Sequence, residues 1–307
     1  MKVAIILNSI SLFRDVFYRK YLPLIQAATD VELFETRSEN DAVSLAQQAV
    51  ENRFEIIAAA GGDGTIHQVL NGMLAAPAAV ENCPALALLP LGSGNDFVRS
   101  LRIDQSPEGF VNRIRAMNTS EIDVGEVIFS VSRPETGVTS IQDKRYFLNV
   151  VDVGMGPPVV RGVLDSGRPL GSAVAYYISI LRTFFTYRPL PLHAKSTNWE
   201  WKSDMRTFAI ANAKYFGNGL CIAPEARLDD GILNVFACGP VSIVDFIIQS
   251  VPLKQGRRVR HPQVFYFSTS GIELSSSEAV ELEADGEIIG WLPATVGLSR
   301  RKIKVLV

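Results

Sequence analysis

The sequence predicts an α/β protein with a second, β-rich part, and two observations support this fold class. In the first 125 residues, short apolar runs alternate with segments of helical periodicity, a pattern typical of a parallel sheet covered by helices on both faces. From about residue 126 onward, most segments are strand-like. We therefore expect an α/β domain at 1–125 and a β-rich domain at 126–293, with the final strand of 294–307 joining either one.

Each element of the first domain has its own apolar pattern. Continuous apolar runs indicate buried strands, and apolar residues three or four positions apart indicate amphipathic helices. Strands are predicted at 2–7, 31–36, 54–60, 85–90 and 121–129, and helices at 14–28, 41–52, 65–76 and from Asn95 onward.

In the second domain the apolar pattern changes to alternation. Val280, Leu282 and Ala284 alternate with Glu281 and Glu283, as expected for a half-buried antiparallel strand. Similar strand-like runs are "RYFLNVV", "MRTFAIANA", "GILNVFA" and "QVFYFSTSGIEL". Only two helices are predicted here, at 171–186 and 241–251.

Composition narrows the class of function. The chain has 307 residues with a net charge of −2 at pH 7, which argues against general nucleic-acid binding. The three cysteines, Cys83, Cys221 and Cys238, lack metal-binding spacing and fit a reducing cytoplasm. The N-terminal run indicates a strand rather than a signal peptide, and the segment 171–185 is too short to span a membrane. We expect a soluble, cytoplasmic protein.

Two glycine-rich turns follow predicted strands of the first domain. The first comprises Gly61, Gly62, Asp63, Gly64 and Thr65, and precedes a helix whose N-terminus can bind phosphate. The alternative is a plain turn, in which Thr65 and Gln68 form a capping box. The turn matches neither the Walker A nor the G-x-G-x-x-G pattern. His67, on the following helix, is expected at the helix surface.

The second glycine-rich turn comprises Gly92, Ser93 and Gly94, and Asn95 and Asp96 open the next helix. Ligands of open α/β sheets bind beyond the carboxyl ends of the strands, so both turns are expected to face one crevice. Asn95 can alternatively serve as a plain N-cap.

Two acidic turns stand out in the second domain. Asp229 and Asp230 precede Gly231, where they form either a hairpin turn or a pair of oxygen ligands for Mg²⁺. Asp285 and Glu287 flank Gly286, which indicates either another turn or a positioned general base.

Four segments in this order resemble the diacylglycerol kinase catalytic family in its bacterial soluble lipid-kinase branch: "GGDGT", "PLGSGND", "APEARLDDGIL" and "DGE". The segments at 123–125, 146–154 and 211–219 are also similar, so the resemblance covers nearly the whole chain. NAD kinases share "GGDGT", whereas the "LDDG" and "DGE" segments favour the lipid kinases.

The resemblance implies an NAD-kinase-like N-terminal nucleotide domain and a C-terminal β-sandwich domain, with the active site in the cleft between them. It implies ATP as substrate and Mg²⁺ as cofactor. Glu287 would be the catalytic base, and Asp63 would orient the phosphates or the metal. The remaining implied roles are nucleotide contacts by Thr36, Gly61, Gly62, Gly64, Thr65 and Ser93, metal ligation by Asp230 with the backbone carbonyls of Arg227 and Ile232, and a supporting acidic network of Asp96, Asp123 and Asp285.

The sequence departs from the family pattern at three places. The usual first loop, "NPxSG", is replaced by "LNSISLF", which keeps only Asn8 and Ser9 as polar residues. Gln68 stands where the family has glutamate, and the segment 154–158 lacks an expected acidic residue. These departures suggest an unusual substrate or weakened activity.

The predicted function is transfer of the ATP γ-phosphoryl group to a hydroxyl of a lipid such as diacylglycerol. The alternatives are an NAD kinase and a non-catalytic nucleotide- or lipid-binding regulator. The basic segment 254–262 indicates either attraction to the inner face of the membrane or a solvated loop. The segment 171–187 would line an acyl-chain groove or pack in the core. No nucleic-acid partner is expected. The sequence is compatible with a homodimer and does not predict which lipid is phosphorylated.

Overall fold

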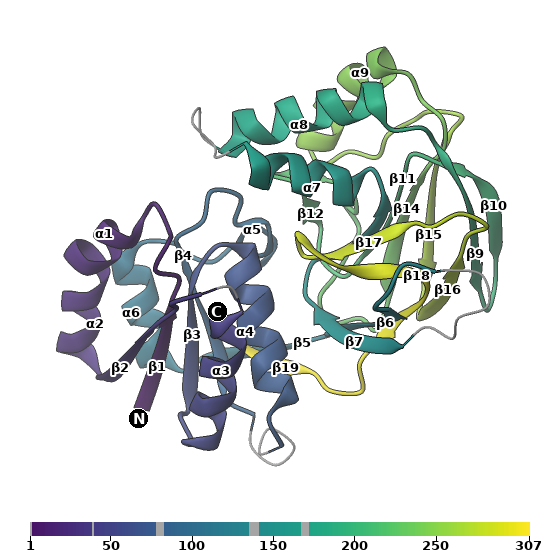
Figure 1. The fold of residues 1–307 in the computed structure, drawn as a ribbon. Coiled ribbons are helices and arrows are strands. Elements are labelled where there is room, and N and C mark those ends of the chain that lie inside the picture. The colour runs from purple at the N-terminus through teal and green to yellow at the C-terminus, as the bar shows by residue number, and fades with distance from the viewer. Residues whose placement is uncertain (1, 39, 78–82, 135–140, 167–171) are drawn as a thin grey trace. The chain divides into compact units, whose positions relative to one another are not determined.

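The computed structural model describes residues 2–38, 40–77, 83–134, 141–166 and 172–307. The chain divides into two compact units: the first unit is Met1–Ile122 with Arg301–Val307, and the second unit is Asp123–Arg300. Figure 1 shows helices around a sheet in the first unit and a mostly β second unit. The predicted combination of α/β and β-rich architecture is confirmed. None of the helices in the described part of the chain is both long and apolar enough to span a membrane.

The first unit is built on a mainly parallel sheet. The strands lie in the order β2 (Asp30–Glu35), β1 (Lys2–Leu7), β3 (Ile56–Gly61), β4 (Ala85–Pro90), β19 (Ile303–Leu306) and β5 (Thr119–Ile122). All neighbours are parallel except β5, which is antiparallel to β19. The central strands are apolar at nearly every position because helices cover both sheet faces.

Helices cover the sheet in two layers. One face packs against η1 (Phe17–Tyr21), α2 (Leu22–Ala28) and α6 (Pro107–Ala116), and the short α1 (Arg14–Val16) precedes η1. The helices α3 (Asp41–Glu51) and α4 (Asp63–Ala75) pack together on the other face (Figure 1). Their close approach requires Gly72, where a Cβ atom would lie 2.2 Å from the carbonyl oxygen of Val43. The short α5 (Asp96–Leu101) follows β4.

The second unit is built on antiparallel strands. Their order is β10 (Glu200–Met205), β9 (Leu190–Ser196), β16 (Gly271–Ser275), β18 (Glu287–Leu298), β17 (Glu281–Ala284), β8 (Val150–Gly154), β11 (Thr207–Ala211), β14 (Leu233–Cys238) and β15 (Val264–Thr269). β6 (Gly125–Ser130) pairs with β18 and with β7 (Gln142–Phe147), and β12 (Tyr215–Phe216) pairs with β13 (Leu220–Cys221).

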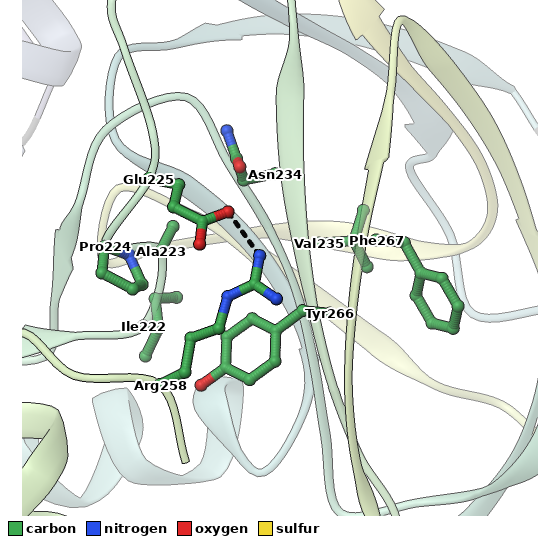
Figure 2. A pocket seen from close by; sticks show the side chains of 9 residues that line it. All are labelled: Ile222, Ala223, Pro224, Glu225, Asn234, Val235, Arg258, Tyr266 and Phe267. Atoms are coloured by element: carbon green, nitrogen blue, oxygen red, sulfur yellow. Dashed lines mark hydrogen bonds and ion pairs between the residues drawn. The ribbon is translucent and has the colours of Figure 1, made fainter. Parts of the chain in front are cut away.

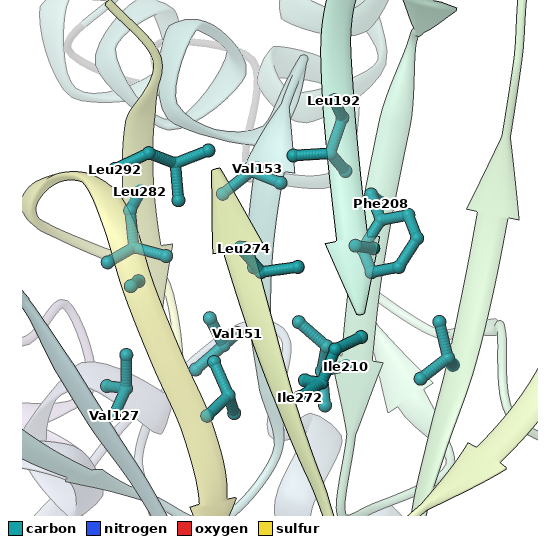
Figure 3. Packing of buried hydrophobic residues seen from close by; sticks show 14 of the residues in the cluster. Val127, Val151, Val153, Leu192, Phe208, Ile210, Ile272, Leu274, Leu282 and Leu292 are labelled. Atoms are coloured by element: carbon teal, nitrogen blue, oxygen red, sulfur yellow. The ribbon is translucent and has the colours of Figure 1, made fainter. Parts of the chain in front are cut away.

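Alternate residues of these strands form the core of the second unit. Figure 3 shows Val151 and Val153 of β8 beside Phe208 and Ile210 of β11, with Leu282 of β17 nearby. Side chains two positions apart share a sheet face, which explains the alternating sequence pattern. The helices α7 (Gly156–Asp165), α8 (Ser172–Thr186) and α9 (Ile243–Lys254) complete this unit.

Several element predictions were wrong. The strand predicted at 121–129 is two strands in different sheets, because Asp123 leaves the first sheet and its N–H donates to the carbonyl of Leu228 at 2.6 Å. α6 and α7 were not predicted. α6 begins after Ser106, whose hydroxyl caps the helix, and both helices carry proline in the first turn, where proline is tolerated. Gly171, the first residue of a predicted helix, lies outside the described residues.

Candidate active site

The loops that follow β1, β3 and β4 lie together at one edge of the first sheet. Leu7 pairs with Ala60, and Gly61 pairs with Pro90, so the three strands end at the same level. The N–H of Leu91 donates to the carbonyl of Gly61 at 2.9 Å, and the hydroxyl of Ser11 donates to the carbonyl of Leu91 at 2.7 Å. The two glycine-rich turns and the first loop are therefore one connected group.

Glycines allow the two turns to touch. A Cβ atom on Gly92 would lie 2.4 Å from the Cα atom of Gly62. A Cβ atom on Gly61 would lie 2.2 Å from Oγ1 of Thr65. Neither position can hold a side chain without moving the backbone. The turns therefore present backbone atoms beside the N-terminus of α4, where the first N–H groups have no partner within the helix.

Asp63 links the first glycine turn to α5. Its Oδ2 accepts from the N–H of Asp96 and its Oδ1 from the N–H of Phe97, both at 3.1 Å. This carboxylate satisfies two N–H groups at the start of α5 and complements the positive end of that helix. Gly94 lies against it, since a Cβ atom there would be 3.2 Å from Oδ2 of Asp63. The structure thus gives Asp63 a connecting role that sequence reasoning missed.

The first loop contacts two of the predicted nucleotide-binding threonines. Nδ2 of Asn8 donates to Oγ1 of Thr65 at 3.2 Å, and the N–H of Ser9 donates to Oγ1 of Thr36 at 3.1 Å. The alternative interpretation, a capping box of Thr65 and Gln68, does not hold, because α4 begins at Asp63 and its N-cap is Gly62. Thr65 instead lies within the first helical turn and accepts from Asn8.

Asn95 shapes the second turn. It has the left-handed conformation, with φ of 52°, and its Nδ2 donates to the carbonyl of Gly92 at 2.9 Å. No side-chain cap bond forms with α5, so the capping role weighed for Asn95 is not seen. Its Oδ1 is buried without a hydrogen-bond partner in the described part of the chain.

Ser93 is exposed. His67 was wrongly expected at the helix surface, since it is buried beside Asn71.

This region suits a phosphate group on physical grounds. Its turns carry glycines at the points of closest backbone approach, and α4 begins directly after them. Backbone N–H groups and the positive end of a helix favour bound anions. Thr36 and Thr65 add buried hydroxyls, and Gly64 lies in the first turn of α4. The predicted nucleotide-binding residues thus come together within the first unit.

In the second unit, Asp123 fixes the acidic turn at 228–231. Its Oδ2 accepts from the N–H of Gly231 at 2.8 Å, and its own N–H donates to the carbonyl of Leu228. Asp123 is 5% exposed, whereas Asp230 within the turn is exposed. The N–H of Ile232 donates to Oδ1 of Asp230 at 3.1 Å. Asp123 and Asp230 were predicted in one network, and the structure brings them to the same turn.

The oxygen donors of this turn are of the kind that Mg²⁺ prefers, because Mg²⁺ binds proteins through few carboxylates and retains several water ligands. Asp230 offers an exposed carboxylate, and Arg227 and Ile232 flank it in the chain. Asp229 pairs with the guanidinium of Arg227 at 3.5 Å instead. In the described residues, no group of three or more His, Cys, Asp or Glu side chains could hold a metal by itself. Any metal here would need backbone and water oxygens.

Asp285 and Gly286 form the two-residue turn between β17 and β18. Ala284 pairs with Glu287, and both turn residues have positive φ, 51° and 89°. This is the geometry expected of an Asp-Gly hairpin turn. The carboxylate of Asp285 accepts from the N–H groups of three consecutive residues, at 2.9, 2.9 and 3.0 Å: Leu148, Asn149 and Val150.

Asn212 connects the two acidic turns of the second unit. Fully buried, it donates through Nδ2 to the carbonyls of Asp123 and Leu148, both at 3.0 Å. The N–H of Leu148 in turn donates to Asp285. Sequence reasoning assigned no role to Asn212, although it lies in the family-like segment 211–219. Glu287 is half-buried at the first position of β18, beside this network.

A buried pair of carboxyl groups lies beside the Asp285 turn. Asp152 and Glu283 are directly opposite in β8 and β17, and both are 0% exposed. Burial raises the pKa of each carboxyl group well above its usual range, and each negative charge would disfavour the other. A Cβ atom on Gly156 would lie 1.9 Å from Oδ2 of Asp152. The carboxyl group of Asp152 therefore occupies the space beside position 156, within the segment that lacks the expected acidic side chain.

A pocket elsewhere in the second unit contains none of the predicted site residues. Figure 2 shows Arg258 and Glu225 forming an ion pair at this pocket, with Tyr266 beneath the guanidinium. The guanidinium carbon of Arg258 lies 4.9 Å from the centroid of the Tyr266 ring. These contacts fix part of the basic segment 254–262 against the sheet.

Comparisons with known proteins match both units. A family model described as the diacylglycerol kinase catalytic domain matches residues 2–127. One described as the YegS C-terminal NAD kinase beta sandwich-like domain matches residues 149–307.

Curated relatives and a solved structure agree with these matches. A diacylglycerol kinase of Staphylococcus haemolyticus is 27% identical over 294 residues, covering 96% of this chain and 83% of its own. One of Bacillus subtilis is 26% identical over 299 residues, covering 95% and 92%. A diacylglycerol kinase crystal structure from Bacillus anthracis strain Sterne has a TM-score of 0.70 at 20% identity, covering 99% and 96%, which supports the fold.

Proposed function

Because this chain belongs to the diacylglycerol kinase family and is a lipid kinase that uses ATP, we propose that it transfers the γ-phosphoryl group to the hydroxyl of a diacylglycerol-like lipid. The observation that carries the proposal is the contact between the two glycine-rich turns, at Gly62 and Gly92. It supports a phosphate-binding backbone at the carboxyl edge of the sheet, where α/β proteins bind ligands.

In this proposal, the first unit binds ATP. The N-terminus of α4 and the turn of Gly61 and Gly62 would hold the phosphate oxygens. Asp63 keeps the two turns in register through its bonds to α5, so its main effect on phosphate is indirect. Asn8 and Ser9 would set the hydroxyls of Thr65 and Thr36, and so replace part of the altered first loop.

Mg²⁺ binding is assigned to Asp230, with the backbone carbonyls of Arg227 and Ile232. Bound there, the cation would neutralise developing negative charge during phosphoryl transfer. Asp123 supports the turn through the N–H of Gly231. Asp96 and Asp285 are supporting residues, of which Asp285 fixes the chain entering β8.

Glu287 is proposed as the general base that accepts the proton of the lipid hydroxyl. It follows the rigid turn of Asp285 and Gly286, and it starts a strand whose position is fixed on both sides. A rigid backbone at this position keeps the orientation of the Glu287 carboxylate fixed, as general-base catalysis requires. The kinase would act at the membrane surface as a peripheral protein at its inner face.

The test is phosphate transfer from labelled ATP with Mg²⁺ to a panel of lipid alcohols in mixed micelles, with NAD as a parallel acceptor. The panel contains diacylglycerol, phosphatidylglycerol and a sphingoid base. We expect labelling of diacylglycerol or another glycerolipid and no formation of NADP. Labelling of NAD alone would overturn the proposal, as would ATP binding without labelling of any lipid alcohol.

A further inference from the structure

The helices α8 and α9 pack side by side in opposite directions in the second unit. The rings of Phe184 and Phe246 have centroids 5.3 Å apart, at the end of α8 and near the start of α9. Nζ of Lys254, at the end of α9, lies 4.3 Å from the ring centroid of Tyr177 in the first half of α8. Figure 1 shows the two helices together at the same end of this unit.

α9 is apolar on both faces. Phe246 and Leu253 face the protein, where they join buried clusters. The opposite face is also apolar, although a surface helix normally carries polar residues there. Its residues occupy positions i, i+3, i+4 and i+7 and are 59%, 53%, 59% and 56% exposed: Val244, Ile247, Ile248 and Val251.

α8 adds a second exposed apolar row. Val174, Ile178 and Phe185 are 45%, 42% and 78% exposed. Each helical residue is rotated by about 100° from the one before it. Phe184 and Phe246 point toward each other across the helix pair. Because the two helices are antiparallel, the next residue on each helix is rotated toward the same side of the pair. These residues are Phe185 and Ile247, so the two exposed rows form one apolar face.

Positive charge is concentrated at the end of α9 and in the segment that follows it. Four exposed cationic side chains lie at the C-terminal end of α9 and in the segment after it: Lys254, Arg257, Arg258 and Arg260. The acidic residue of α9, Asp245, lies at the start of the helix, where it forms a capping box with Ser242. The segment after α9 returns to this end, and Nε2 of His261 lies 3.8 Å from Oδ2 of Asp245. Glu225 neutralises Arg258 only. An apolar face with cations at its edge matches a bilayer whose anionic headgroups surround an apolar interior.

We propose that the α8–α9 face, made of the two exposed apolar rows and the cations Lys254, Arg257 and Arg260, docks this protein on an anionic lipid surface. The inference rests on the proposed function, since it names the surface from which the kinase would take its substrate. A second copy of the chain suits the face less well, because it would bring the same positive charges rather than opposite ones.

The test is co-sedimentation of the full chain with phosphatidylcholine vesicles, with and without phosphatidylglycerol, at low and high salt. The apolar variant is Ile247→Ser/Ile248→Ser, and the charge variant is Arg257→Glu/Arg260→Glu. Arg258 and Lys254 are left unchanged because they contact Glu225 and Tyr177. Matched controls elsewhere in the second unit are Val131→Ser and Lys195→Glu, both at exposed positions. Thermal unfolding checks that each variant folds.

We expect the wild type to bind vesicles that contain phosphatidylglycerol and to lose binding at high salt. Each face variant should bind at least about tenfold more weakly, while the controls bind normally. All variants should phosphorylate a short-chain diacylglycerol dissolved as monomers at the wild-type rate. Vesicle binding that is unchanged in both variants would overturn the inference, as would a dimer in sedimentation velocity that Ile247→Ser/Ile248→Ser dissociates. Vesicle binding without any lipid phosphorylation would overturn the proposed function and leave the docking face intact.

Discussion

Asp152 lies directly opposite Glu283 in the antiparallel pair of β8 and β17, with both carboxyl groups fully buried. Burial raises both pKa values, and the charge of Asp152 raises that of Glu283 further, so the folded state binds more protons than the unfolded state. The protonated pair leaves the folded state at its full stability at low pH. This stability is lost as the pH rises above the ordinary carboxyl pKa, about 4. We predict that the free energy of unfolding falls with pH above this value.

The variant Glu283→Gln should reduce that slope, because it keeps the side-chain shape and removes one titrating group. At pH 8 it should be more stable than the wild type, because glutamine has no charge to bury. Urea unfolding at pH 5 and pH 8 measures the effect. Glu273→Gln, at an exposed position of β16, is the control. An equal pH slope in the wild type and Glu283→Gln would contradict the prediction.

Asp285→Ala should destabilise the second unit. It removes the acceptor of three buried backbone N–H groups, and each unsatisfied donor is costly. The expected loss is roughly 3 kcal/mol in the free energy of unfolding. Asp285→Asn should lose less, since asparagine tolerates positive φ and keeps one acceptor oxygen. A loss no larger than that of Asp229→Ala, in the exposed turn, would show that these three bonds are unimportant.

Gly92→Ala should weaken ATP binding. A Cβ atom at this position would lie 2.4 Å from the Cα atom of Gly62, so the two turns must separate. Displacement of the phosphate-binding backbone should raise the dissociation constant for ATP by at least about tenfold. Gly271→Ala is the matched control, because its nearest neighbour would be 3.8 Å away, at ordinary contact distance. Calorimetric titration with ATP should separate the two variants; equal affinities would contradict a role for the Gly62–Gly92 contact.

Asp123→Ala should raise the Mg²⁺ concentration needed for half-maximal activity. The carboxylate holds the N–H of Gly231, directly after the proposed ligand Asp230. Loss of this acceptor should loosen the turn and weaken metal binding about tenfold. Asp123→Asn keeps an acceptor oxygen and should recover most of the affinity. If both variants have the wild-type Mg²⁺ dependence, then Asp123 does not support a metal site.

Much of the fold could be predicted from the sequence because its strands have simple burial patterns. β1 and β4 have the predicted bounds, since both sheet faces are covered and nearly every residue is apolar. The break between β5 and β6 was not predictable from hydrophobicity, because it depends on a bond between Asp123 and Leu228 in distant segments. α7 was not predicted: it begins at Gly156 with two prolines after it, and this residue combination ordinarily marks a turn.

The candidate site was predictable to the extent that its chemistry is local in sequence. The Asp285-Gly286 dipeptide indicates a hairpin turn by itself, and the structure has one. The bonds from Asp63 to α5 and the pairing of Asp152 with Glu283 depend on loop packing and strand register. Neither relationship has a short-range sequence signal, so only the folded chain reveals it.

The most direct test of the proposed chemistry compares the wild type with Glu287→Gln, measuring lipid phosphorylation and ATP affinity on the same samples. Glutamine keeps the size of the side chain but cannot accept a proton from the lipid hydroxyl. We predict that turnover falls by at least about a hundredfold, whereas the dissociation constant for ATP stays within about twofold of the wild-type value. Turnover close to wild type would contradict the assignment of Glu287 as the general base, and an equal loss of ATP binding would show that the residue holds nucleotide instead.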